Sequence, residues 1–221
     1  VEVCAETKSI KKVIALSTDK ASSPINLYGA TKLCSDKLFI SSNNFFGKRQ
    51  FVVVRYGNVA GSRGSVLPLF IDQAKKNEFT VTDPKMTRFN ISLERGIKTV
   101  EWTVNNCLGG EIVVPKIKSY KILDVINSFS NKPKIKTIGI RFGEKIHEEM
   151  ISIHDSKNTY KIGDYYVILP HGDKKILNFY RSKTKSKKVE SNFSYTSDGN
   201  KEFMTISEIK KTVNEIVKKI I

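Results

Sequence analysis

Residues 13–32 have the sequence VIALSTDKASSPINLYGATK, in which an apolar run is followed by a polar turn and then by a helical pattern. Segment 11–16 predicts a strand buried on both faces of a parallel sheet, because its apolar run is short and continuous. The turn at 22–24 contains a proline and predicts the start of a helix over 25–43. Its core candidates are Leu27, Leu33, Leu38 and Phe39.

A second unit of the same kind follows. Segment 51–56 (FVVVRY) predicts another buried strand, and 66–77 predicts a helix after a glycine-containing loop. Strands joined by helices lie parallel with right-handed crossovers, so we expect an α/β fold with a doubly wound parallel sheet. Nucleotide-binding sheets of this kind usually begin with G-x-G-x-x-G, which these 221 residues lack. We therefore expect the C-terminal part of a Rossmann-like NAD(P)-binding domain, without its first half.

The sequence predicts three parts. Residues 1–78 are expected to hold the remaining Rossmann-like half with the catalytic groups. Residues 79–170 are expected to form a smaller α+β substrate-binding region, interleaved with the sheet. Its predicted elements are strands at 79–82, 111–114, 136–140 and 165–169 and helices at 93–107 and 120–129. Residues 171–221 are expected to form an irregular lysine-rich excursion up to residue 200 and a final helix from about residue 207.

Composition limits the classes of function. The formal net charge is +16, from 38 basic and 22 acidic residues, which raises the possibility of a nucleic-acid partner. The lysines are spread along the chain rather than striped with aromatic residues, and the densest cluster, at 183–188, suggests a loop. No apolar run is long enough to cross a membrane, and residues 1–12 do not resemble a secretory signal, so we expect a cytoplasmic protein.

The cysteines Cys4, Cys34 and Cys107 are scattered along the chain. They form no C-x-x-C pair or Cys/His cluster, so the sequence supports no metal site. We expect reduced thiols that are mostly buried.

Two pairs of side chains in the opening stretch suggest proton transfer. Tyr28 and Lys32 are four residues apart and share one side of the predicted helix. An ammonium near a phenol favours the phenolate, which could take a proton from a sugar hydroxyl. Asp19 and Lys20 follow the first strand, at the end of a parallel sheet where active sites form. Taken alone, Tyr28 and Lys32 would more often be an ordinary surface pair of a helix, and Asp19 and Lys20 would be a solvated loop pair.

These residues resemble motifs of the extended short-chain dehydrogenase/reductases, in their nucleotide-sugar branch. The chain is similar to the inverting UDP-N-acetylglucosamine 4,6-dehydratases that open pseudaminic acid biosynthesis. The likeness lies in five blocks in order: VIALSTDKASSPINLYGATKLCSDKLF, VVRYGNVAGSRGSV, DPKMTRFNIS, GGEIVVPKI and IGIRFGEKIHEEMI. It departs at Phe142, where the family usually has proline, and at Asn90, where it often has tryptophan.

The resemblance implies a role for each residue. Tyr28 would deprotonate the hydroxyl on sugar carbon 4, and Lys32 would hold the cofactor ribose. Lys20 would remove the proton from carbon 5, while Asp19 protonates the hydroxyl leaving carbon 6. Thr18 would contact the substrate. The residues implied in catalysis are therefore Thr18, Asp19, Lys20, Tyr28 and Lys32, and those implied in cofactor binding are Tyr28, Lys32 and Val59.

The resemblance also implies a nucleotide-sugar pocket. An arginine fork suits phosphate, and a carboxylate suits ribose hydroxyls. The implied substrate residues are Asn58, Arg63, Gly64, Ser65, Val66, Leu67, Arg88, Arg141 and Glu144. The implied cofactor is NADP, with NAD as the alternative, and the implied partners are a UDP-sugar and either the missing N-terminal half or further copies of the chain.

Several alternatives stay open. The chain could be an inactive or partner-requiring piece of such an enzyme, because it lacks the glycine-rich turn that binds pyrophosphate. It could be a related sugar-nucleotide epimerase or reductase. A basic nucleic-acid-binding module is the least favoured interpretation.

Overall fold

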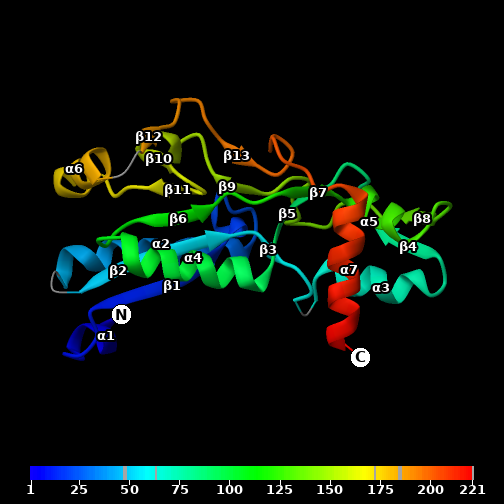
Figure 1. The fold of residues 1–221 in the computed structure, drawn as a ribbon, viewed down its shortest axis with the longest axis horizontal. Coiled ribbons are helices and arrows are strands. Elements are labelled where there is room, and N and C mark those ends of the chain that lie inside the picture. The colour runs from blue at the N-terminus through cyan, green and yellow to red at the C-terminus, as the bar shows by residue number, and fades with distance from the viewer. Residues whose placement is uncertain (47–48, 63, 172, 184–185, 221) are drawn as a thin grey trace. The chain divides into compact units, whose positions relative to one another are not determined.

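The computed structural model in Figure 1 describes residues 1–46, 49–62, 64–171, 173–183 and 186–220. The chain divides into two compact units that alternate along the sequence. Unit 1 contains residues 1–56, 94–116 and 149–195, and unit 2 contains residues 57–93, 117–148 and 196–221. The three-part division at residues 78 and 170 stays a prediction.

Unit 1 is built on a six-stranded sheet with the order β1-β2-β6-β11-β10-β12. Strands β1 (Lys12–Thr18), β2 (Gln50–Tyr56) and β6 (Ile112–Pro115) are parallel and lie side by side in Figure 1. Antiparallel strands β11 (Tyr165–Ile168), β10 (Thr159–Ile162) and β12 (Lys187–Lys188) extend the sheet from β6. The predicted parallel sheet is therefore confirmed, and it continues into an antiparallel edge that the sequence did not predict. Strand β1, predicted to be buried on both faces, is only partly buried, with Leu16 50% exposed, because it lies at the end of this sheet.

Helices pack on both faces of this sheet. Successive β2 residues from Phe51 to Val54 are fully buried, as expected for a strand covered on both sides. On one face, Phe51 contacts Phe39 of α2 (Leu27–Phe45), with ring centroids 6.2 Å apart. On the other, Val52 and Val54 belong to a cluster that includes Val100 and Trp102 of α4 (Leu93–Asn106). The doubly wound arrangement is thus confirmed.

The remaining elements of unit 1 are short. Helix α1 (Glu2–Glu6) precedes β1, and the 3₁₀ turns are η1 (Asp19–Ala21) and η2 (Asp155–Asn158). Strand β9 (Glu149–Ile151) pairs with β13 (Tyr195–Thr196).

Unit 2 has its own sheets and core. Strands β3 (Asn58–Val59), β5 (Thr87–Ile91) and β7 (Ser119–Lys121) form one sheet, and β4 (Glu78–Val81) pairs with β8 (Lys134–Thr137). Helices α3 (Val66–Ala74), α5 (Ile122–Phe129) and α7 (Ile206–Ile220) supply apolar side chains to one core. Phe70 and Phe79 meet edge to face within it, with centroids 5.7 Å apart. None of the helices in the described part of the chain combines the length and apolarity needed to span a bilayer.

The structure corrects one prediction about the segment 171–200. The segment contains helix α6 (Lys174–Lys183). The Asp173 carboxylate caps the first turn of this helix by accepting a 3.0 Å hydrogen bond from the Ile176 backbone N–H. Ile176 and Tyr180 are buried in the core of unit 1, and Leu177 and Phe179 pack against it, so one apolar face docks this lysine-rich helix. Thr184 and Lys185, in the cluster expected to form a loop, lie outside the described residues.

Other corrections are local. Leu27 and Leu38, predicted in the core, are 80% and 56% exposed. Cys34 is exposed, whereas Cys107 is buried. The helix predicted over 120–129 starts only at Ile122, because residues 119–121 pair with β5 as strand β7.

Candidate active site

The turn after β1 brings the first pair of candidate groups together. The Asp19 side chain is fully buried, and its Oδ1 accepts hydrogen bonds from the Thr18 hydroxyl at 2.9 Å and from the Lys20 ammonium at 3.0 Å. The Thr18 hydroxyl also caps η1 by accepting from the Lys20 backbone N–H. Asp19 Oδ2 is buried and has no hydrogen-bond partner among the described residues. The turn thus engages one carboxylate oxygen and leaves the other without a hydrogen bond from the described residues.

The second pair lies in the first turns of α2. The Asn26 side chain caps the helix by accepting a 2.8 Å hydrogen bond from the Gly29 N–H. The Lys32 ammonium donates a 2.8 Å hydrogen bond to the Leu16 carbonyl of β1, while Tyr28 is 55% exposed. The helix therefore holds the lysine at the carboxyl end of β1 and leaves the phenol accessible.

Gly29 explains how close the two pairs are. A Cβ built at this position would lie 2.4 Å from the Lys20 carbonyl oxygen and 3.0 Å from Pro24. Only glycine permits this approach of the α2 backbone to η1. The structure thus brings all the residues predicted for catalysis into one strand–turn–helix unit at the carboxyl end of β1, where parallel sheets form their sites.

Unit 2 holds the predicted substrate residues around a pocket of about 360 Å³. Those that line it are Asn58, Gly64, Val66, Arg88, Arg141 and Glu144. Because Gly64 and Val66 flank the start of α3, the amino end of that helix borders the pocket, where backbone N–H groups and the helix dipole favour an anion.

The other residues predicted to bind substrate or cofactor do not line this pocket or lie outside the described residues. Leu67 is 4% exposed and belongs to the core of unit 2, and Ser65 is the N-cap residue of α3, with a buried hydroxyl that has no partner in the described part of the chain. Neither lines the pocket. Val59, predicted to contact cofactor, pairs with Ile91 of β5. Arg63 lies outside the described residues.

Arg88 holds the loop that carries two other pocket residues. Its guanidinium donates to the backbone carbonyls of Thr87, Lys145 and Ile146 at 2.7–3.0 Å. Glu144 lies 3.9 Å from it, and Arg141 precedes that glutamate across a turn closed by the Glu144 N–H. Phe142, between them, is fully exposed, so the departure from the family's proline places a large apolar side chain in solvent.

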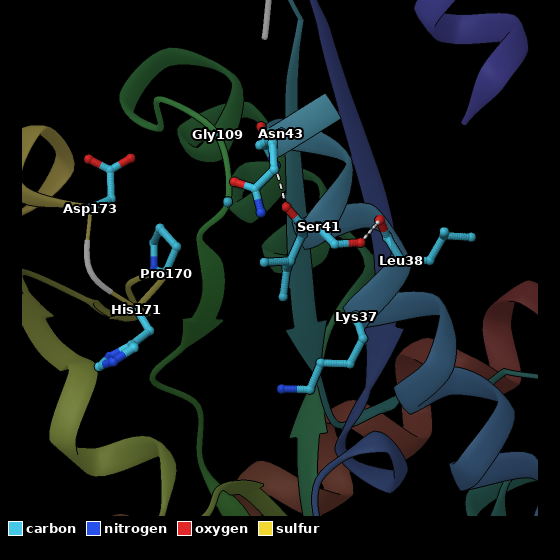
Figure 2. Close-up of a pocket in the computed structure, with 11 residues that line it drawn as sticks. Lys37, Leu38, Ser41, Asn43, Gly109, Pro170, His171 and Asp173 are labelled. Atoms are coloured by element: carbon cyan, nitrogen blue, oxygen red, sulfur yellow. Dashed lines mark hydrogen bonds between the residues drawn. The ribbon is translucent and has the colours of Figure 1, made fainter. Parts of the chain in front are cut away.

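A larger pocket, of about 460 Å³, lies elsewhere in unit 1 and contains none of the predicted site residues (Figure 2). It is lined by residues of the second half of α2, Gly109, Gly110, Pro170, His171 and Asp173. The Asn43 side chain accepts from the Phe51 N–H at 3.0 Å and donates to the Phe51 carbonyl at 2.9 Å. The Asn43 amide is therefore engaged with the backbone of β2. The strand–turn–helix segment that carries Asp19, Lys20, Tyr28 and Lys32 is the candidate active site.

Sequence reasoning missed a residue that contacts the turn between the two candidate pairs of side chains. Glu149, in β9, accepts hydrogen bonds from the hydroxyls of Ser22 and Ser23 in the turn between η1 and α2. The contact spans more than 120 residues, and no local pattern indicates it. His147 Nδ1 lies 2.9 Å from the Thr87 hydroxyl oxygen.

The model of the family described as "Polysaccharide biosynthesis protein" matches residues 1–170. This chain belongs to that family. Two relatives from Campylobacter jejuni strains, each named UDP-N-acetylglucosamine 4,6-dehydratase (inverting), are 47% and 48% identical over 97% of this chain. A UDP-glucose 4-epimerase from Rickettsia canadensis is 37% identical over 91% of it. The chain spans 66% of the length of the Campylobacter relatives and 61% of the Rickettsia relative.

Solved structures show a similar fold. Pen from Bacillus thuringiensis has a TM-score of 0.78 and 32% identity, covering 96% of this chain and 64% of that one. A UDP-glucuronic acid 4-epimerase from Bacillus cereus has a TM-score of 0.62 at 18% identity, covering 99% and 65%, which is a likeness of fold. The resemblance found in the five sequence blocks and the predicted Rossmann-like α/β fold are confirmed.

Proposed function

We propose that this chain carries the catalytic and substrate-binding residues of a nucleotide-sugar 4,6-dehydratase that inverts carbon 5 of UDP-N-acetylglucosamine. The observation that carries the proposal is the packing of two acid/base pairs in one unit. Epimerisation at carbon 4 needs a base for one hydroxyl. Elimination of water across carbons 5 and 6 needs a second base and an acid, and Asp19 with Lys20 are suited to those tasks.

The proposed reaction begins at Tyr28, which takes the proton from the carbon-4 hydroxyl. Lys32 stabilises the phenolate with its positive charge. Transfer of a proton from Lys20 to Asp19 across their hydrogen bond leaves a neutral amine and a neutral carboxyl. Once carbon 4 is a ketone, the proton on carbon 5 is acidic, and the Lys20 amine removes it. Asp19 gives a proton to the hydroxyl on carbon 6, which leaves as water. Proton return to the opposite face of carbon 5 then inverts that centre.

Asp19 is suited to the role of acid by its surroundings. A neutral carboxyl carries one O–H donor. Its Oδ1 already accepts from Thr18 and Lys20, so the proton belongs on Oδ2, the buried oxygen without a partner among the described residues. A carboxyl held in this way has one oxygen fixed and the other able to donate to substrate.

A nicotinamide cofactor fits one part of this site. Tyr28 is exposed and Lys32 is fixed at the carboxyl end of a parallel strand, where Rossmann-like sheets hold the nicotinamide end of a dinucleotide. When bound, NADP or NAD would accept hydride from carbon 4 and return it to carbon 6. We propose that Tyr28 and Lys32 contact the ribose and that Val59 borders the nicotinamide. The 221 residues contain no G-x-G-x-x-G turn that could bind the pyrophosphate.

The nucleotide-sugar is proposed to bind in the pocket of unit 2. Its volume of about 360 Å³ is within the usual range for small-ligand sites. The amino end of α3 and the exposed Arg141 suit the diphosphate, and Glu144 Oε2, buried without a partner in the described residues, can accept from ribose hydroxyls. We further propose that the cofactor is NADP and that further copies of the chain are its partners. The proposed setting is the biosynthesis of surface or flagellin glycans of the pseudaminic acid type in the cytoplasm.

The test is a product assay. The 221 residues are assayed alone and as a fusion to the segment of a Campylobacter jejuni relative that the match leaves uncovered, with NADP and UDP-N-acetylglucosamine. The proposal predicts that the fusion makes a 4-keto-6-deoxy sugar nucleotide, seen by NMR as a new methyl group on carbon 6. A fusion that only epimerises or reduces carbon 4 would contradict it. Measuring NADP binding to the 221 residues alone tests whether they hold cofactor without added sequence.

A second candidate, a UDP-sugar 4-epimerase, is favoured by the Rickettsia relative. It requires Tyr28 and Lys32 but gives no task to Asp19 and Lys20. The two functions are therefore separated by variants at those two positions.

A further inference from the structure

We propose that Glu149 is a positioning residue that holds the turn between the two acid/base pairs in its active geometry. The inference rests on the proposed function. Glu149 is half-buried in β9, and its Oε2 accepts hydrogen bonds from the Ser22 hydroxyl at 3.1 Å and the Ser23 hydroxyl at 2.6 Å. One carboxylate oxygen thus anchors two adjacent residues of the η1–α2 connection.

The backbone of this connection needs an anchor. Ser23 has φ of 44°, a left-handed conformation that non-glycine residues rarely adopt. Such conformations persist where surrounding contacts enforce them, and they concentrate at functional sites. The short Ser23–Glu149 hydrogen bond is a contact of this kind, because an ionised acceptor makes it stronger than a neutral one.

The anchored turn joins both catalytic pairs. On its amino side, the Ser22 N–H donates a 3.1 Å hydrogen bond to the Asp19 carbonyl, which closes η1. On its carboxyl side, Gly29 packs on the Lys20 carbonyl. A shift of Ser22 and Ser23 therefore changes the position of Asp19 and Lys20 relative to Tyr28. Proton transfer is sensitive to displacements of about 1 Å, so the rate depends on this turn.

Strand β9 is itself firmly held, which makes it a suitable anchor. Arg55 of β2 donates a 3.0 Å hydrogen bond to the carbonyl of Met150, the residue after Glu149. The same guanidinium pairs with Asp36 of α2 at 3.1 Å, and both side chains are almost fully buried. This ion pair ties β9 to the helix that carries Tyr28 and Lys32. Breaking it would leave a buried unpaired charge and threaten the fold, so Glu149 is the better position for a test.

The first measurement is steady-state kinetics of the fusion enzyme described above. Glu149→Ala is expected to lower kcat by about 10- to 100-fold with KM within about twofold, since the turn moves while the nucleotide pocket is unchanged. Glu149→Gln keeps an acceptor oxygen and is expected to stay within about threefold of wild type. Glu101→Ala, at an exposed position of α4, is the matched control and should leave kcat unchanged. Equal kcat in Glu149→Ala and wild type would overturn the proposal.

The serines provide a second pair of variants. Ser23→Ala removes the hydroxyl but keeps the strained backbone, whereas Ser23→Gly removes the hydroxyl and the strain together. If Glu149 holds the strained turn, Ser23→Ala should lower kcat more than Ser23→Gly. The reverse order would contradict a positioning role.

The second measurement does not depend on activity. Amide hydrogen exchange of residues 19–29 in the 221-residue chain should be at least about tenfold faster in Glu149→Ala than in wild type and in Glu149→Gln. Unchanged exchange in Glu149→Ala would overturn the anchoring role. If the wild-type fusion makes no 4-keto-6-deoxy sugar, the proposed function fails, and the exchange experiment still decides whether Glu149 holds the turn.

Discussion

Gly29 lies against the backbone carbonyl of Lys20 so closely that a Cβ at position 29 would fall 2.4 Å from the carbonyl oxygen. This contact sets the distance between the helix that carries Tyr28 and the turn that carries Asp19. It involves backbone atoms on both sides, so neither partner can swing away as a flexible side chain would.

Replacing Gly29 by alanine is therefore expected to separate the two pairs. We expect Gly29→Ala to destabilise unit 1 by about 1–3 kcal/mol and to lower kcat of the fusion enzyme by about 100-fold. Thermal unfolding and steady-state kinetics measure the two effects. Gly96→Ala in α4 is the matched control: a Cβ there meets no atom within 4 Å, so alanine should stabilise the helix by about 0.4–1 kcal/mol. Equal behaviour of the two variants would show that the Gly29 contact has no special role.

The Tyr28 hydroxyl is expected to matter for chemistry but not for folding. Since Tyr28 is 55% exposed, Tyr28→Phe should leave the melting temperature unchanged. It should reduce kcat by about 100- to 10,000-fold, the usual contribution of a general base. Ser41→Ala, in the second half of the same helix, serves as the control. A Tyr28→Phe enzyme with near-normal kcat would require a different base.

Substitution of Asp19 distinguishes a dehydratase from a 4-epimerase. Asn has the shape of Asp but cannot protonate a leaving hydroxyl. For a dehydratase, Asp19→Asn should stop elimination by at least about 100-fold while hydride transfer from carbon 4 continues. Reduced nicotinamide should then accumulate on the enzyme and be visible in its ultraviolet absorbance. If Asp19→Asn instead retains full epimerase activity at carbon 4, the epimerase interpretation is correct.

The start of α7 predicts a pH dependence of stability. Glu208 and Thr205 form a capping box, in which the Glu208 carboxylate accepts from the Thr205 N–H at 2.9 Å and the Thr205 hydroxyl accepts from the Glu208 N–H at 3.2 Å. The hydrogen bond from Lys118, followed by that from the Thr205 backbone, lowers the pKa of Glu208 from 4.5 to about 2.

A carboxyl whose pKa is lower in the folded state stabilises the fold above its unfolded pKa. This contribution should be complete above about pH 4.5 and should disappear as the pH falls toward about 2. Urea unfolding across this range should show a weaker pH dependence in Glu208→Gln than in wild type. Glu215→Gln, at an exposed position of the same helix, should keep the wild-type slope. Identical slopes in all three proteins would exclude the capping box as the source.

The elements that the sequence predicted well are those encoded by local patterns. The continuous apolar run before Thr18 and the FVVVRY segment correspond to β1 and β2, within two residues at each end. The Tyr28–Lys32 spacing placed both side chains in one helix, because helical periodicity is a local property.

The parts that the sequence did not predict depend on distant contacts. The lysines of α6 favour a solvated loop, although Ile176 and Tyr180, one helical turn apart, pack in the unit 1 core. Leu27 and Leu38 are apolar yet exposed, so hydrophobicity alone misplaced them. Glu149 acts on Ser22 and Ser23 across more than 120 residues, and Arg55 meets Asp36 only once β2 and α2 have packed.

We propose that two acid/base pairs in unit 1 carry out redox chemistry at carbon 4 and elimination at carbons 5 and 6. Running the fusion enzyme with UDP-N-acetylglucosamine in D₂O and examining the sugar by NMR follows both steps in one product. We expect a 4-keto product with a methyl group at carbon 6 and one deuterium at carbon 5 in the inverted configuration. A product that keeps its carbon-6 hydroxyl and its carbon-5 proton, and differs from substrate only at carbon 4, would contradict the proposal.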